Sequence, residues 1–246
     1  AEFSARAAMV VCGTEFALRL FQLAGADGEV CCPTGEAAAP GQLLLRVRGG
    51  AASLHAAWKT AQTLAEALSG IATATQAIVQ AVRSAGYELP VACTRKNFPG
   101  TRLWTAAAVQ AGGGVMHRLG LSETLLVFPE HLAFVAPAER AARLARLARM
   151  QPEKRLVVEV GSEAEALDAA RLGADVLQLE RFTPERLQAL RERLAGGGLS
   201  PRLAAAGGVN AANAAAYARA GADLLVTSAP YFAPPADIRV SIVAAN

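Results

Sequence analysis

Basic side chains follow two short segments near the middle of the chain, and their type suits them to bind an anion. Arg95 and Lys96 come directly after an apolar run, and the pair His117-Arg118 follows the glycine triplet at 112–114. Glycine lets the backbone approach a ligand closely, and adjacent basic groups supply charge-assisted hydrogen bonds to carboxylate or phosphate. The pattern indicates a site for a small anion. A polar turn with solvated charges is the plainer alternative.

Carboxylates, glycines and hydroxyls stand within or just after later apolar runs. They are Glu159, Glu180, Gly207, Gly208, Thr227 and Ser228. Two nearby carboxylates can bind ribose hydroxyls or hold Mg²⁺ through oxygen. A glycine turn before a helix is typical of phosphate sites, because backbone N–H groups and the helix N-terminus face the anion. Taken singly, Glu159 would only pair with a neighbouring Arg and the glycines would only form a turn, since such short motifs often occur by chance.

A repeated framework is expected to position these residues. From residue 88 onward, short apolar runs alternate with helical segments. The runs lie at 89–92, 125–128, 156–160, 176–179, 203–206 and 224–227, and the helical segments at 138–150, 162–172, 184–194 and 210–220. This repetition predicts a parallel sheet closed as a barrel. In such barrels the chemistry lies at the C-terminal ends of the strands, so the candidate residues are expected to gather at one rim.

The first part of the chain has a different pattern of apolar residues. Residues 1–50 favour strands at 3–11, 29–32 and 43–47 around a short helix at 14–23. From 54 to 84 the apolar residues recur at intervals of three and four, which predicts a helix, and Ser69-Gly70 predicts a bend in it at 69–73. Lys59 is the one basic residue of the first half of that helix. It is either a surface lysine whose stem packs on apolar neighbours or a functional residue.

Composition excludes several classes of protein. The chain has 246 residues, of which 53% are hydrophobic and 18% charged, as in a globular protein of one large or two modest domains. A net charge of +3 gives no case for nucleic acid. No apolar run reaches the roughly 18 residues that span a bilayer, and no signal peptide is visible. The chain begins at Ala1 in an expected strand, so part of a natural N-terminus is expected to be missing.

Two other groups of residues have plain interpretations. The four cysteines have neither redox nor zinc spacing, and are expected to be buried thiols in a reducing cytosol. They are Cys12, Cys31, Cys32 and Cys93. An arginine recurs every three residues along one predicted helix, at 140, 143, 146 and 149, which most simply gives a solvated face and alternatively an interaction surface.

The order of these motifs resembles the nicotinate-nucleotide pyrophosphorylase (quinolinate phosphoribosyltransferase) family. The segments that carry the resemblance are 94–102, 112–121, 69–73, 158–160 and 207–210. Segments 96–102 and 119–131 look closer to the ModD-type branch, whose members are pyrophosphorylase-like and associated with molybdenum transport. The match covers nearly the whole chain, apart from the N-terminal portion that is expected to be missing.

The resemblance implies an enzyme of NAD biosynthesis. It would transfer phosphoribose from phosphoribosyl pyrophosphate to quinolinate, with Mg²⁺, releasing pyrophosphate and CO₂ and forming nicotinate mononucleotide. The resemblance also implies a cytoplasmic homodimer in which the partner completes each site. The implied fold is an N-terminal α/β sandwich domain at 1–85, an open α/β (TIM-like) barrel with the phosphoribosyl site at 86–230, and a C-terminal segment at 231–246 that returns to the first domain.

The same resemblance assigns roles to individual residues. Arg95, Lys96, His117 and Arg118 would face the acid substrate, and Lys59 would stand where the family has an arginine from the partner subunit. Glu159 and Glu180 would address the ribose or the metal. The phosphate would be held by Gly207 and Gly208, with Thr227 and Ser228 in the final phosphate turn.

Several positions depart from the family pattern. The family has a lysine at Phe128, an Asp-Asn pair at Glu180-Arg181, a serine at Ala206, a glycine at Ser228 and a histidine at Phe232. Phe128 removes a cation that would offset one charge of a dicarboxylate, whose burial unpaired is costly. Two functions stay open: a phosphoribosyltransferase with a shifted acceptor, and a non-catalytic protein that binds an oxyanion or a molybdenum-cofactor-related ligand.

Overall fold

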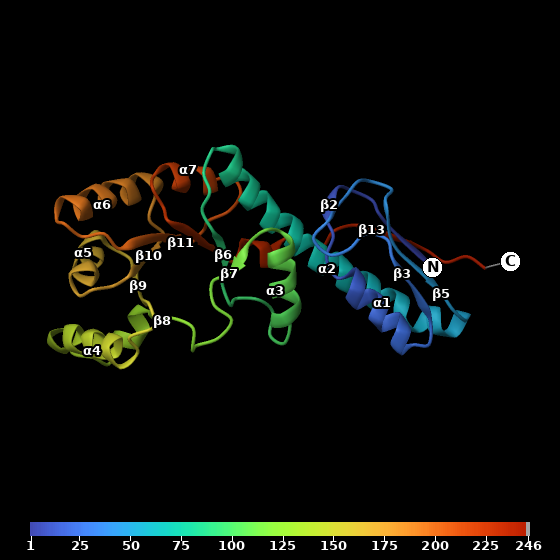
Figure 1. Cartoon of the computed structure of the whole chain (residues 1–246), viewed down its shortest axis with the longest axis horizontal. Coiled ribbons are helices and arrows are strands. Elements are labelled where there is room, and N and C mark those ends of the chain that lie inside the picture. The colour runs from blue at the N-terminus through green and yellow to red at the C-terminus, as the bar shows by residue number, and fades with distance from the viewer. Residues whose placement is uncertain (245–246) are drawn as a thin grey trace. The chain divides into compact units, whose positions relative to one another are not determined.

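The computed structural model describes residues 1–244, and their contacts divide the chain into two compact units (Figure 1). Unit 1 contains Ala1–Gln80, Lys96–Met116 and the C-terminal segment from Ala229 onward. Unit 2 contains Ala81–Arg95 and His117–Ser228. Within residues 1–244, no helix combines the length and the apolar character needed to cross a membrane.

Unit 1 is built on an antiparallel sheet with the strand order β13-β1-β5-β3. The strands are β1 (Glu2–Ala5), β3 (Asp27–Val30), β5 (Leu43–Arg48) and β13 (Ile238–Ser241). One face of the sheet shares a buried core with α1 (Thr14–Leu23) and α2 (Ala51–Ser84). In this core Phe3 meets Phe21 edge to face, with ring centroids 5.8 Å apart. The other face includes the polar side chains of Glu2, Glu29 and Arg46, at alternate positions of their strands.

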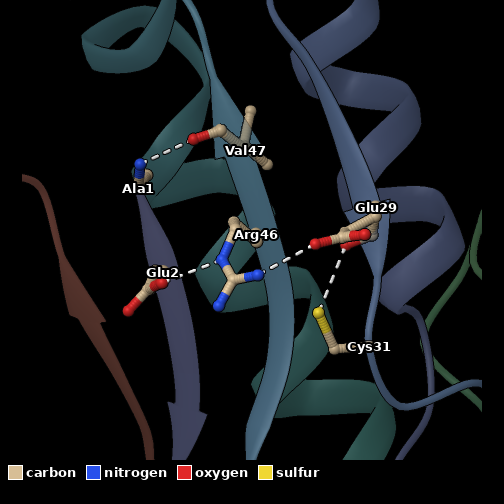
Figure 2. Close-up of polar contacts among 6 residues, drawn as sticks. All are labelled: Ala1, Glu2, Glu29, Cys31, Arg46 and Val47. Atoms are coloured by element: carbon tan, nitrogen blue, oxygen red, sulfur yellow. Dashed lines mark hydrogen bonds and ion pairs between the residues drawn. The ribbon is translucent and has the colours of Figure 1, made fainter. Parts of the chain in front are cut away.

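Arg46 links three strands on that polar face. Its Nε donates to Glu2 on β1 at 2.9 Å and its Nη1 to Glu29 on β3 at 3.0 Å (Figure 2). Both carboxylates are more than half exposed, so solvent screens each pair and its contribution to stability is small. The thiol of Cys31 lies beside the Glu29 carbonyl and is exposed, whereas Cys12, Cys32 and Cys93 are buried. The expectation of four buried thiols is therefore wrong for Cys31.

The expected strand at 3–11 is two strands. β1 ends at Ala5, and β2 (Met9–Val10) pairs with β4 (Ala37–Ala38) in a separate small sheet. The chain turns at Arg6, whose N–H donates to the Asp237 carbonyl. The segment expected at 29–32 likewise begins and ends two residues earlier, at Asp27 and Val30.

The bend expected at 69–73 is absent, because α2 is a continuous helix of 34 residues. Gly70 is needed for close packing: a Cβ there would lie 2.4 Å from the Pro234 carbonyl oxygen. Ser69 also serves a contact, since its hydroxyl accepts from Cys12 N–H at 2.9 Å and donates to the Cys12 carbonyl at 3.2 Å. Gly112, from the glycine triplet, packs in the same way, and its Cβ would lie 2.3 Å from the Ala72 carbonyl oxygen.

Unit 2 holds a parallel sheet in the order β6-β12-β11-β10-β9-β8. The strands are β6 (Val91–Cys93), β8 (Leu125–Val127), β9 (Leu156–Val160), β10 (Val176–Glu180), β11 (Arg202–Ala206) and β12 (Leu224–Thr227). Most strands are joined by helices, namely α4 (Pro137–Met150), α5 (Glu163–Arg171), α6 (Pro184–Gly196) and α7 (Ala214–Arg219). The predicted fold class, an α/β sandwich domain with an open, barrel-like α/β sheet, is confirmed.

The two faces of this sheet have different neighbours. The alternate positions that include Leu177 and Leu203 are fully buried, on strands that α5 and α6 cover. The opposite face holds a core of Ala92, Leu126, Val157, Val176, Ala204, Ala206 and Val226, packed by Phe128. We call this second face the inner face. Because side chains alternate along each strand, Glu159, Gln178 and Glu180 lie on the inner face too.

The last helix of unit 2 begins later than expected. The pattern predicted a start at Asn210, but α7 covers only Ala214–Arg219. Asn213 Oδ1 accepts from Asn210 N–H at 2.8 Å, and Asn210 Oδ1 accepts from Ala212 N–H at 2.9 Å. These side chains compete with the backbone for its hydrogen bonds and hold a turn ahead of the helix.

Unit 1 also contains α3 (Arg102–Ala111) and the short strand β7 (Val115–Met116). In the described part of the chain, two 3₁₀ helices complete the elements, η1 (Pro129–Leu132) in unit 2 and η2 (Ala229–Phe232) in unit 1.

Candidate functional site

Cationic side chains gather at the end of β6 in unit 2. The His117 N–H donates to the Cys93 carbonyl at 2.8 Å, and the Thr94 N–H donates to the Thr227 carbonyl at 2.9 Å. Burial lowers the pKa of His117, and the neighbouring Arg118 charge lowers it further. The imidazole is therefore neutral near pH 7, and both of its nitrogens can take part in hydrogen bonds.

Arg118 and Arg95 repel one another in this cluster. Burial lowers the pKa of Arg118 first and the charge of Arg95 lowers it next, while Glu123 acts in the opposite sense without reversing the net direction. Arginine stays protonated in proteins all the same. Two like charges held close together destabilise the ligand-free site, and a bound anion would relieve the repulsion.

Phe128 gives Arg118 an aromatic neighbour. The guanidinium carbon lies 5.9 Å from the centroid of the Phe128 ring, within the range of a weak cation–π contact. The Phe128 N–H donates to His131 Nδ1 at 2.9 Å, and the two rings have centroids 5.5 Å apart. The remaining histidine, His55, is exposed on α2 in unit 1.

Glu159 and Gln178 are partners across β9 and β10. They face each other in the strand register, and Gln178 Nε2 donates to Glu159 Oε2 at 2.6 Å. Gln178 is only 5% exposed, and its Oε1 is buried without a hydrogen-bond partner among the described residues. Our sequence analysis missed Gln178. Its signal was a polar residue at an alternate position of the strand Val-Leu-Gln-Leu-Glu.

Glu180 ends β10 opposite Ala206, and Gly207 makes room for it. A Cβ at Gly207 would lie 2.7 Å from Glu180 Oε1 and 2.8 Å from Arg181 N. Arg181 takes a positive φ of 56°, and its N–H donates to the Ala206 carbonyl at 2.9 Å. Its Nε lies 3.5 Å from Glu180 Oε1, but the Arg181 side chain is largely exposed, so this ion pair is weak.

The glycine turn after β11 is held by amide side chains. Gly207 and Gly208 have positive φ values of 78° and 99°. The Gly208 carbonyl accepts from Asn210 Nδ2 at 3.1 Å and from Asn213 Nδ2 at 3.0 Å. This arrangement turns the Gly208 carbonyl toward the start of α7.

Thr227 ends β12 next to this turn, and Ser228 is the residue that follows the strand. The Thr227 hydroxyl donates to the Val209 carbonyl at 2.6 Å, which ties β12 to the chain just beyond the two glycines. Ser228 is half-buried and follows on the alternate face. Thr227 therefore braces the turn through its side chain.

Two candidate residues, Lys59 and Lys96, belong to unit 1, so the group gathered in unit 2 does not include them. Lys59 is exposed on α2, where its Nζ lies 4.3 Å from the centroid of the Trp58 ring and donates to Gln62 at 2.9 Å. These contacts are those of a surface lysine. A role for Lys59 or Lys96 with the ligand stays a prediction.

Comparison with known proteins shows the class of this chain. Models of the N-terminal and C-terminal domains of quinolinate phosphoribosyl transferase match residues 1–69 and 71–241. The chain therefore belongs to the quinolinate phosphoribosyl transferase family, a family of pentosyltransferases.

Particular relatives support the expected branch. A Rhodobacter capsulatus protein, provisionally named pyrophosphorylase ModD, is 47% identical over 221 residues, which cover 88% of this chain and 83% of that protein. The nicotinate-nucleotide pyrophosphorylase (carboxylating) of Mycobacterium leprae is 39% identical over 190 residues, 77% of this chain and 65% of that protein. The structure of the nicotinate-nucleotide pyrophosphorylase of Francisella tularensis shares the fold, with a TM-score of 0.85, 24% identity, and coverage of 97% and 83% of the two chains. The predicted resemblance to the ModD-type branch is confirmed.

Proposed function

We propose that this chain transfers phosphoribose from phosphoribosyl pyrophosphate to quinolinate or a related carboxylate acceptor, as a nicotinate-nucleotide pyrophosphorylase-like enzyme. The observation that carries the proposal is the grouping of three kinds of residue in unit 2. Cations follow β6, carboxylates lie on β9 and β10, and a glycine turn follows β11. An anionic acceptor, a ribose and a phosphate each need one of these groups.

The cations would orient the acceptor. Arg95 and Arg118 offer forked donors to its carboxylate groups, and neutral His117 can donate or accept one hydrogen bond. Held in this way, the acceptor nitrogen would meet the anomeric carbon of the ribose, so that the protein lowers the barrier mainly by orientation. A ring nitrogen needs no general base.

The carboxylates would act on the ribose. As pyrophosphate leaves, positive charge develops on the anomeric carbon, as at other glycosyl centres. Glu159 and Glu180 would stabilise that charge, and the peptide N–H groups of the turn at Gly207 and Gly208 would hold the 5′-phosphate. The Thr227 hydroxyl would keep that turn in place through Val209, and Ser228 would face the phosphate.

The carboxylates also fit a magnesium ion that arrives with the substrate. Among residues 1–244, no group of three or more His, Cys, Asp and Glu side chains is placed to hold a metal ion. Mg²⁺ commonly binds one or two carboxylates together with substrate phosphates. Glu159 and Glu180 lie on the same face of neighbouring strands and would serve in this way. The ion would neutralise charge on the departing pyrophosphate.

The proposal includes a homodimer with shared sites. Lys59 and Lys96 would then contact the acid substrate, Lys59 from the partner subunit. Lysine lacks the planar fork of arginine, so Lys59 would contribute one point charge and no bidentate contact. A link to molybdenum transport or utilisation is part of the same proposal, drawn from segments 96–102 and 119–131.

Phe128 favours a second candidate function, a non-catalytic protein that binds an oxyanion or a molybdenum-cofactor-related ligand. The ring beside Arg118 adds no charge for a second carboxylate of a dicarboxylate acceptor. An oxyanion has no second carboxylate to pair, so it would not need a cation at residue 128.

Calorimetry separates the two candidates. The enzyme requires a heat of binding for phosphoribosyl pyrophosphate with Mg²⁺, and pyrophosphate release when quinolinate or a related acid is added. Binding of molybdate without any heat from phosphoribosyl pyrophosphate would favour the second candidate and refute the first. Sedimentation of the protein at low and high concentration tests the dimer.

A further inference from the structure

We propose that Gln178 is a positioning residue, which holds the Glu159 carboxylate in one orientation for the ligand. This inference deepens the proposed function, and it rests on that function only for the ligand's identity. It concerns a hydrogen bond between two residues of the chain, from Gln178 Nε2 to Glu159 Oε2 at 2.6 Å.

The strand register explains why Gln178 reaches Glu159. Gln178 and Glu159 are directly paired across β10 and β9. On the other side of Glu159, Val127 pairs with Val158, so Phe128 is the next residue along and its ring has no donor for a carboxylate. On the far side of Gln178 the register partner is Ala204, whose methyl group has no donor either. In this row of the inner face, the Gln178 amide donates to Glu159 across the two strands.

The orientation of the Gln178 amide follows from the chemistry of its partner. An ionised carboxylate only accepts hydrogen bonds, so the NH₂ group must face Glu159 and Oε1 must face away. Oε1 is buried and has no partner among the described residues. A buried carbonyl oxygen without a donor opposes folding. An apolar side chain of similar length would thus suit the strand better than Gln178 does.

A residue that costs stability and fixes a carboxylate is typical of a functional site. The bond engages one of the roughly four lone pairs of the Glu159 carboxylate and restricts its rotation, so that the others keep a fixed direction. A ligand hydroxyl or a metal ion that binds there would not have to order the side chain first. Gln178 itself need not touch the ligand.

Gln178→Met tests the inference, because methionine keeps the length and removes the donor. Melting temperature is expected to stay the same or to rise. The affinity for phosphoribosyl pyrophosphate with Mg²⁺ is expected to fall about tenfold, the loss that corresponds to one hydrogen bond to a charged group. Gln188→Met is the matched control: Gln188 donates to Glu192 at 3.3 Å on the exposed face of α6, and its loss should leave affinity unchanged.

A double-mutant cycle separates positioning from a general structural effect. If Gln178 acts through Glu159, Gln178→Met should add little to the loss caused by Glu159→Gln. Additive losses, or a lower melting temperature with unchanged affinity, would overturn the inference. Gln178→Asn, which keeps the amide but is too short to reach Glu159, gives the same test if the methionine variant does not fold.

A second measurement needs no ligand, so it tests the positioning role of Gln178 even if the proposed function is wrong. Crystal structures of the unliganded wild type and of Gln178→Met should show Glu159 in one orientation in the first and displaced or in several orientations in the second. An unchanged Glu159 in the variant would refute positioning, whether or not phosphoribosyl pyrophosphate binds the wild type.

Discussion

The guanidinium of Arg118 lies over the ring of Phe128, with 5.9 Å between the guanidinium carbon and the ring centroid. Arg118 therefore has two kinds of neighbour: the like charge of Arg95, which repels it, and the aromatic face of Phe128, which attracts it. The face partly offsets the burial of the guanidinium without neutralising it. The charge therefore remains available to an anion. In the proposed function, residue 128 decides whether a further cation stands beside the acceptor.

Phe128→Lys should change which acceptor the protein prefers. A third cation beside Arg118 and Arg95 would offset a second carboxylate, so quinolinate should bind about tenfold more tightly than in the wild type, and a monocarboxylate should gain less. The unliganded protein should lose stability, because like charges are brought together. Calorimetry with both acids measures the selectivity. Phe134→Lys is the control, since Phe134 is 99% exposed; equal effects of the two variants would mean that only net charge matters.

The low pKa of His117 predicts a pH dependence. Because the folded pKa lies below the unfolded one, the unfolded chain binds the proton more readily as pH falls below about 6.5, and this group then destabilises the fold; above that pH its effect vanishes. Arg118→Met should raise the pKa of His117, since it removes the second cause of the shift. NMR titration of the His117 ring protons measures it. Arg143→Met, on exposed α4, should leave the titration unchanged.

Gly207→Ala should damage both the stability of the fold and the proposed phosphate site. Its Cβ would lie 2.7 Å from Glu180 Oε1 and 2.8 Å from Arg181 N, and a positive φ alone costs an alanine about 1–2 kcal/mol. Gly198→Ala isolates that backbone cost, because Gly198 also has a positive φ but no atom within 4 Å of the added Cβ. Urea unfolding should give the larger loss for Gly207→Ala. Equal losses would mean that Glu180 and Arg181 move aside freely.

The strand ends of unit 2 could be predicted, because an apolar run followed by a polar residue marks the point where a buried strand meets the surface. The run at 156–160 coincides with β9 and the run at 224–227 with β12. Gln178 could not be found in the same way, because it is an uncharged residue inside the apolar run at 176–179 and nothing next to it in the sequence indicates a partner. Its partner, Glu159, is far away in the sequence, and only the register brings the two together.

The roles of the glycines were only partly predictable, because a glycine that breaks a helix and one that lets another segment approach look alike in a sequence. Gly207 was read correctly as a turn, with a positive φ. Gly70 was read as a bend and lies in a continuous helix. The difference comes from Pro234, which is far along the chain, so no local pattern carries it.

Gly70→Ala distinguishes a glycine that only weakens a helix from one that is needed for packing. The two cases predict opposite signs for the change in stability. Helix propensity alone would make alanine more stable than glycine by about 1 kcal/mol. Packing predicts the reverse, because the added Cβ would lie 2.4 Å from the Pro234 carbonyl oxygen and 3.1 Å from the Pro235 Cα, and backbone atoms cannot move aside as a flexible side chain can. The variant should therefore be less stable in urea or thermal unfolding. Gly196→Ala, in the last turn of α6 with no atom near its Cβ, should gain stability or stay unchanged, and the same gain at Gly70 would show that the segment at Pro234 yields easily.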